Sequence, residues 1–155
     1  MKALVHKRIA ITLTGLAVAS TAALAHHGVT GRYDASQPIL ISGEVVETTF
    51  SPPHPTLSIR VEAGSVPTDG LGRPQEYFGP VVSRAEDAGV VRTVELSPVR
   101  MFYDLGQKLR SGDRVTLVAL QNCLSPHQLR STWVRLSGGE VVSYTGDWAR
   151  GVDGC

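Results

Sequence analysis

Residues 39–63 read ILISGEVVETTFSPPHPTLSIRVEA, and this stretch contains the clearest structural signal in the chain. Residues 39–50 are rich in β-branched residues and alternate in their middle, and residues 56–63 alternate between apolar and polar side chains, as half-buried strands do. Between them, three prolines within residues 51–55 cannot donate to a strand ladder and favour a turn. The stretch therefore predicts a β-hairpin, in which Gly43 marks a bulge or bend.

Three later segments also have the composition and alternation of strands. They cover residues 90–97, 115–120 and 129–145. We expect the last of them to form two short strands around Gly138-Gly139. Residues 64–89 are instead dominated by glycine, proline and charge, which predicts a long loop with a short helical turn near residues 83–88.

A short helix is predicted between the third and fourth strands. Pro98 suits the first turn of a helix, Ser97 is the expected cap, and the helix would cover residues 99–105 and end at Gly106. Three strands, a helix and two further strands follow the chain order of an OB-type barrel. The sequence thus predicts an all-β fold with one short helix, a small five-stranded OB-like barrel over residues 38–145. A split sandwich has similar strand content but needs no helix at this point.

The beginning of the chain has the features of a secretory signal peptide. Three basic side chains lie within the first eight residues, an apolar stretch of small residues follows, and Ala23-Leu24-Ala25 has the small-x-small pattern of a cleavage site. We expect residues 1–25 to be removed, leaving a periplasmic or secreted protein with no membrane span after cleavage. The alternative is an uncleaved N-terminal anchor.

Cleavage after Ala25 would leave 130 residues, which is enough chain for one domain. We divide it into an N-terminal arm over residues 26–37, the barrel, and a C-terminal tail over residues 146–155. The mature chain would hold twelve basic and fourteen acidic side chains, a net charge of −2, with Lys108 as its only lysine. Such a chain is a poor candidate for nonspecific binding to nucleic acid or to anionic membranes, because both depend on basic patches.

Two cysteines remain, Cys123 and Cys155. In an oxidising compartment a lone pair usually forms a bridge, which here would fasten the C-terminal tail to an internal loop. Closing a loop of this size contributes about 3–4 kcal/mol in the chain-entropy model. Two free thiols or a redox pair are the alternatives, but the sequence has no C-x-x-C spacing to support redox work.

Five short motifs occur together in this chain. They are His26-His27, Tyr33-Asp34, Gly43-Glu44-Val45, Pro53-His54 and Ser111-Gly112-Asp113. In this combination the chain resembles an uncharacterised bacterial exported family, a domain of unknown function, over about residues 26–142. It departs from the family pattern where Gly28-Val29 replaces Ser-Phe and where Pro53 replaces asparagine. The resemblance implies export and a single small β domain, and it implies no activity.

The four histidines of the mature chain, His26, His27, His54 and His127, are candidate metal ligands. After cleavage His26 would carry a free α-amine beside its imidazole, so one residue could chelate an ion with two nitrogens. The reference pKa of such an amine, about 7.7–8.0, allows a metal to displace its proton near neutral pH. An all-nitrogen site favours Cu(II), with Zn(II) as the second choice.

His54 and His127 fall in the two loops that flank one surface of an OB barrel, which brings them into the same hypothesis. Asp34 is a possible oxygen ligand or acceptor for an imidazole N–H. The simpler alternative is that loop histidines are solvated polar residues and that His26-His27 is a frayed terminus.

The remaining polar and aromatic residues give weaker signals. Glu95, Asp104 and Asp113 are expected to serve caps and turns, and no nucleophile elbow accompanies the serines near the histidines. Trp133 is expected in the core, whereas Trp148 could stack on a sugar or peptide.

The leading hypothesis is therefore a protein, not an enzyme, that binds, delivers or sequesters a transition metal. A second hypothesis is an OB-type module that binds an oligosaccharide, a peptide or another exported protein between the His54 and His127 loops, without a metal. Oxidation by a histidine-held copper is the least favoured reading.

Overall fold

The computed structural model describes residues 32–64, 67, 70–145 and 151–155. The predicted signal peptide, His26, His27 and Trp148 lie outside the described residues. No helix in the described part of the chain is long and apolar enough to cross a membrane.

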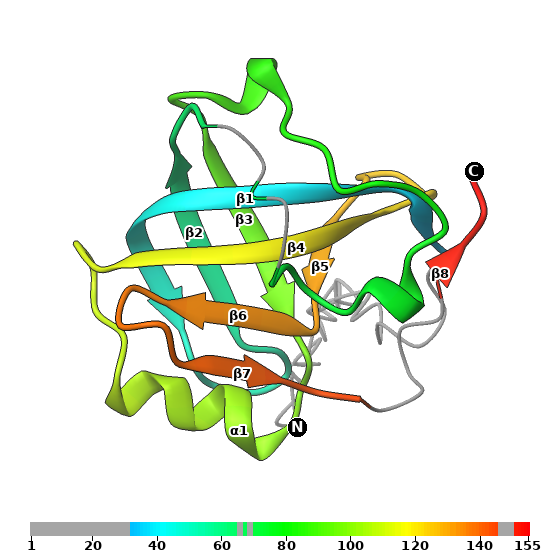
Figure 1. Ribbon diagram of the computed structural model, residues 1–155. Helices are drawn as coiled ribbons and strands as arrows, with labels where there is room; N and C mark the ends of the chain where they lie inside the picture. Colours follow the sequence, from blue (N-terminus) through cyan, green and yellow to red (C-terminus); the bar gives the residue numbers. More distant parts are fainter. Residues whose placement is uncertain (1–31, 65–66, 68–69, 146–150) are drawn as a thin grey trace, which may run out of the picture.

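The described residues form one mixed sheet of eight strands (Figure 1). The strands are β1 Tyr33–Thr49, β2 Thr56–Val61, β3 Val91–Leu96, β4 Arg114–Asn122, β5 Leu129–Ser131, β6 Trp133–Leu136, β7 Val141–Ser143 and β8 Gly151–Val152. Their order is β7-β6-β4-β5-β3-β2-β1-β8, and a further pairing of β4 with β1 closes five of them into a ring. Every pairing within the ring is antiparallel except that of β3 with β5. The expected mostly-β fold with one short α-helix is confirmed for the described residues.

The predicted hairpin is confirmed as β1 and β2, which pair from Thr49↔Thr56 to Gly43↔Val61. The bulge lies between Val45 and Glu47 and not at Gly43. A Cβ at Gly43 would lie 2.0 Å from the backbone oxygen of Arg60, so glycine is needed here because two backbones approach closely.

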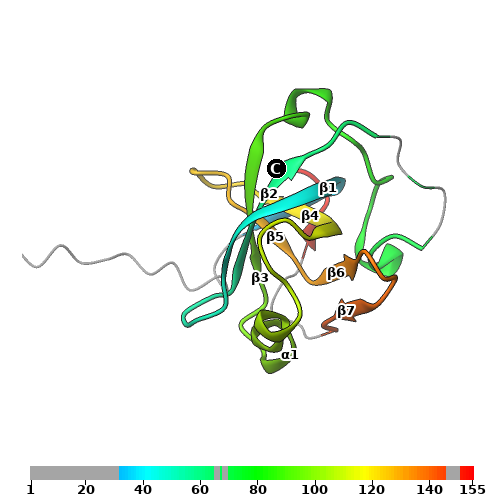
Figure 2. The same cartoon turned by 90° about the vertical axis from the view of Figure 1, so that its left-hand side faces the viewer.

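Alternate residues of the ring strands form one buried apolar cluster, as the period of two predicts. From the ring strands it contains Ile39, Ile41, Val45, Leu57, Ile59, Val61, Val94, Leu96, Val115, Leu117, Ala119 and Leu129, and Val134 joins it from β6. Phe102 and Leu105 add to it from the helical segment at one end of the ring (Figures 1 and 2). Fully burying a side chain of this size contributes roughly 1.5–3 kcal/mol, so this interior accounts for much of the stability of the fold.

The helix begins later than the sequence predicts. α1 covers Arg100–Tyr103 and continues as a 3₁₀ helix over Asp104–Gln107. Val99, extended at φ −121° and ψ 152°, is the cap residue and makes no side-chain cap bond. The prediction of Ser97 as the cap is wrong, because the cap position falls at Val99 and Ser97 is fully buried just after β3.

The predicted long loop is held along the free edge of β1. The N–H groups of Phe78 and Gly79 donate to the Ala35 carbonyl, and Val82 exchanges backbone hydrogen bonds with Pro38 and Leu40. The loop contains 3₁₀ helices at Pro74–Glu76 and Ala85–Asp87, and the second confirms the predicted helical turn. These bonds cover an edge that would otherwise be open to pairing with another chain.

Two further differences extend the sheet beyond the expected strands. β1 starts at Tyr33, so residues 33–37 of the expected N-terminal arm pair with β4 and β8 or with the long loop. β8 lies within the expected C-terminal tail. Residues 129–145 form three strands and not two, because Thr132 separates β5, which pairs with β3, from β6, which pairs with β7.

Candidate site at the Glu95 cluster

Glu95 connects the two loops that the sequence singles out. His54, in the β1–β2 loop, has its Nδ1 3.0 Å from Glu95 Oε1. Gln128, at the end of the β4–β5 loop, donates a hydrogen bond from its side-chain amide to the other oxygen, Glu95 Oε2. The β1–β2 and β4–β5 loops therefore meet at one buried carboxylate.

Strand alternation explains the direction of the Glu95 side chain. Val94 and Leu96 belong to the interior cluster, so Glu95 between them points to the outer face of the ring. Its register partners there are Thr56 on β2 and Arg130 on β5. The expectation that Glu95 serves a cap or turn is wrong, because it lies within β3 and the two loops cover it to 6% exposure.

Arg130 and Tyr33 extend this cluster to the start of β1. The guanidinium carbon of Arg130 lies 5.4 Å from the centroid of the Tyr33 ring, and both residues are buried. Burial raises the pKa of Tyr33, and the positive charge of Arg130 opposes this change. Burial lowers the pKa of Arg130, while the charges of Tyr33 and Glu95 oppose that change. We call His54, Glu95, Gln128, Arg130 and Tyr33 the Glu95 cluster.

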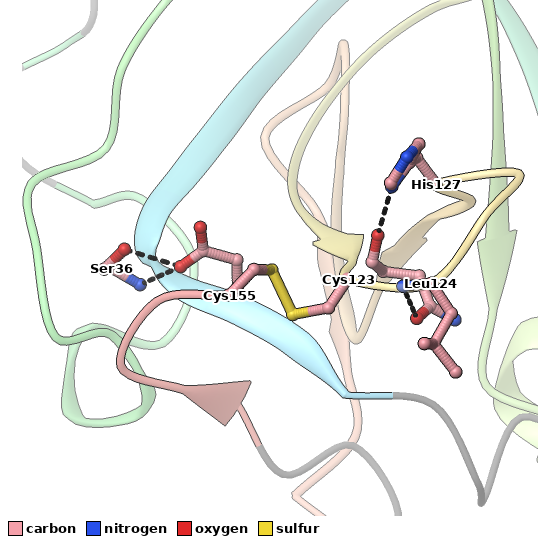
Figure 3. The surroundings of a disulfide bond; sticks show 7 residues. Ser36, Cys123, Leu124, His127 and Cys155 are labelled. Carbon is pink, nitrogen blue, oxygen red and sulfur yellow. Dashed lines mark hydrogen bonds between the residues drawn. A yellow bond between two sulfur atoms is a disulfide. The ribbon is translucent and has the colours of Figure 1, made fainter.

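His127 is adjacent to Gln128 but has different surroundings. Its ring is exposed, its Nδ1 lies 3.0 Å from the backbone oxygen of Asn122, and its backbone φ is 59° (Figure 3). The ring lines an open pocket beside the disulfide, together with Asp34 and Arg84. The structure thus brings the His54 and His127 loops together at Glu95, while the two rings contact different groups. The described residues contain no group of three His, Cys, Asp or Glu side chains that could hold a metal ion.

The predicted disulfide is present between Cys123 and Cys155, with a Cα–Cα distance of 5.3 Å (Figure 3). It joins the β4–β5 loop to the end of the chain just after β8. Nearby, Asp34 accepts hydrogen bonds from the N–H and the hydroxyl of Ser36, at 2.8 and 2.5 Å. These bonds lower the pKa of Asp34, because they favour its charged form. Asp34 is therefore engaged by Ser36 and not by either described histidine.

Other sequence expectations have mixed outcomes. Trp133 is buried as expected, with the Arg135 guanidinium 5.6 Å from its ring centroid. Asp113 accepts a hydrogen bond from the Arg110 N–H at 2.7 Å, which confirms its role in a turn. The sequence analysis missed Arg130, although its place between Leu129 and Ser131 in a buried strand is the kind of pattern that marks a paired charge.

Comparison with known proteins gives one match. The model of DUF6152, a family of unknown function, matches residues 13–70. This segment includes β1, the β1–β2 loop with His54, and β2, whereas Glu95 and the rest of the ring lie outside it. No curated protein and no solved structure was found to match. The match therefore assigns no function to this chain.

Proposed function

We propose that the protein is exported, to the periplasm or beyond the cell, and binds a transition metal through His26, His27 and His54. Cu(II) is the first choice and Zn(II) the second, and His127 is an optional ligand. The observation that carries this proposal is that β1 starts at the cluster that holds His54. Tyr33 contacts Arg130, Arg130 is in register with Glu95, and Glu95 contacts His54.

The length of the linking segment is consistent with such a site. Five residues, 28–32, separate His27 from Tyr33. Fully extended, this part of the chain spans at most about 20 Å, which is the farthest that His27 could lie from Tyr33. A tether of this length raises the local concentration of the His26 and His27 nitrogens around the loop imidazole.

We also propose that the five-stranded ring is an OB-like barrel. The cyclic order β1-β2-β3-β5-β4, the parallel pairing of β3 with β5, and α1 between β3 and β4 support this assignment. In OB folds the loops between the first and second and the fourth and fifth strands flank the ligand-binding surface. These are the loops that carry His54 and His127.

The ligand set favours binding over catalysis. The α-amine and imidazole of a first-residue His26 would chelate one ion, and His27 and His54 would supply further nitrogens, a donor set that favours copper in the divalent affinity order. The proposed role is binding, delivery or sequestration of the metal and not an enzymatic reaction.

The test uses the processed chain obtained by expressing the full sequence and confirming its first residue by mass spectrometry. Titration with Cu(II) is compared with a variant that retains one extra residue before His26. We expect the extra residue to weaken binding by at least tenfold, because it moves the α-amine away from the His26 imidazole. Equal affinity of the two chains would remove the chain-start amine from the site.

A second candidate is a module that binds a peptide or an exported protein between the two loops without a metal; an oligosaccharide is the other ligand class. It is favoured by Leu124, which is 59% exposed on the β4–β5 loop beside His127 (Figure 3). This alternative predicts that chelators leave ligand binding intact and that Leu124→Ser abolishes it. The metal proposal predicts instead that the chain binds Cu(II) with no other ligand present and that a chelator removes the bound ion.

A further inference from the structure

We infer that Glu95 is a positioning residue for the metal site, which fixes the ring of His54 and couples the β1–β2 loop to the β4–β5 loop. The inference rests on the proposed function, and it assigns to Glu95 a role that its position in a strand does not suggest. Glu95 does not contact the metal in this scheme but acts through His54.

The contacts of Glu95 are divided between the two loops. Oε1 faces His54 Nδ1 at 3.0 Å, and neither atom has another hydrogen-bond partner within the described residues. Oε2 accepts from the Gln128 amide. One carboxylate therefore positions a side chain from each loop, and a substitution of Glu95 removes a contact of both loops.

This geometry selects one form of the neutral imidazole. A carboxylate oxygen can only accept a hydrogen bond, so the proton of a neutral His54 ring must be on Nδ1. A proton on Nε2 would leave two lone pairs facing each other at 3.0 Å in a buried place. With the proton on Nδ1, the lone pair of Nε2 is available to a metal ion.

The carboxylate also makes the ring a better ligand. A metal-binding histidine commonly donates its second N–H to a carboxylate, which orients the ring and increases its basicity. Glu95 is 6% exposed and stands beside the buried guanidinium of Arg130 in register, so it is held in place before any metal arrives. Removing such a partner typically lowers metal affinity by about 10- to 100-fold.

The first test needs no metal. Ring nitrogen chemical shifts of His54 are measured by NMR on the ¹⁵N-labelled, metal-free protein at a pH where the ring is neutral. We expect the proton on Nδ1. A proton on Nε2 would overturn the inference about Glu95 and leave the proposed function standing, whereas a wild-type chain that binds no Cu(II) would overturn the proposed function itself.

The second test is a double-mutant cycle read out by competition titration with Cu(II). We expect Glu95→Ala to weaken binding by about 10- to 100-fold. Glu95→Gln should cost less, because the glutamine oxygen can still accept from Nδ1 while Gln128 reverses its amide. In a His54→Ala background both changes at position 95 should have no further effect. Equal losses with and without His54 would overturn the inference.

The cycle remains decisive if Glu95→Ala does not fold, because Glu95→Gln keeps the size and a hydrogen-bond acceptor and can be measured in its place. A matched control is Asp87→Asn, which changes another buried carboxylate that pairs with Arg92, near the opposite end of β3. This control should reduce stability and leave Cu(II) affinity within about twofold of wild type. A loss in the control as large as that of Glu95→Ala would also overturn the inference.

Discussion

The β1–β2 and β4–β5 loops are built from similar residues but hold their histidines in different ways. Both contain serine, proline and one histidine, SPPHP at residues 51–55 and SPHQ at residues 125–128. His54 faces the buried carboxylate of Glu95, whereas the exposed His127 faces a backbone carbonyl and its loop is joined to the C-terminus by a disulfide. The difference teaches that the role of a loop histidine is set by its partner from another strand and not by the local sequence.

The largest expected effect concerns the covalent anchor of the β4–β5 loop. Replacing both Cys123 and Cys155 by serine should lower the free energy of unfolding by about 3–4 kcal/mol, because the 32-residue separation they bridge is then unconstrained in the unfolded chain. Urea unfolding at constant pH measures the change. Wild-type protein in a reducing agent should match the double variant, and a loss below about 1 kcal/mol would show that the bridge contributes little.

The second effect separates the two histidines as ligands. We expect His54→Ala to weaken Cu(II) binding by about 30- to 100-fold, or about 2–3 kcal/mol, and His127→Ala by less than about threefold. The reason is that a buried carboxylate holds the His54 ring, whereas the exposed His127 ring contacts a backbone oxygen. Competition titrations with the processed chain provide the measurement. Equal losses in the two variants would make the loops equivalent and would contradict the distinction drawn between them.

Much of the fold follows from local patterns in the sequence. The β1–β2 hairpin, the helical segment after β3, the Gly138-Gly139 turn and the disulfide all depend on residues whose alternation, turn preference or chemistry can be recognised in short windows. The early start of β1 is different, because residues 34–38 read DASQP and have loop composition. They join the sheet through partners far away in the sequence, β4, β8 and the long loop.

The site was only half predictable for the same reason. The sequence indicated His54 and the two loops, and the structure brings those loops together. The sequence did not indicate that Glu95 is their common partner, because a lone glutamate in an alternating strand usually faces water. Only the closure of the ring, which sets Glu95 beside Arg130 and below both loops, turns an outward-facing residue into a buried one.

A smaller effect should be seen in stability without metal. His54→Ala leaves one oxygen of buried Glu95 without its partner, which should cost roughly 1–2 kcal/mol of unfolding free energy. His127→Ala removes an exposed contact with a backbone carbonyl and should cost about 0.5 kcal/mol from that contact, besides any change in backbone preference. Thermal unfolding in the presence of a chelator measures both. Identical losses would mean that Glu95 does not distinguish the two loops in the metal-free protein.

The smallest effect tests the backbone of the β4–β5 loop. His127 has φ 59°, in the left-handed region that costs an L-residue about 1–2 kcal/mol, whereas glycine adopts it readily. Both His127→Ala and His127→Gly lose the imidazole contact with the Asn122 oxygen, so that loss cancels when the two variants are compared. Part of this gain in stability is lost, because glycine also increases the conformational entropy of the unfolded chain. We therefore expect His127→Gly to be more stable than His127→Ala by about 0.5–1 kcal/mol, measured by urea unfolding.

Position 54 provides the control. The contact with Glu95 dominates there, so the same pair of substitutions should show no advantage for glycine. An advantage there would show that backbone preference, and not the carboxylate, separates the two loops.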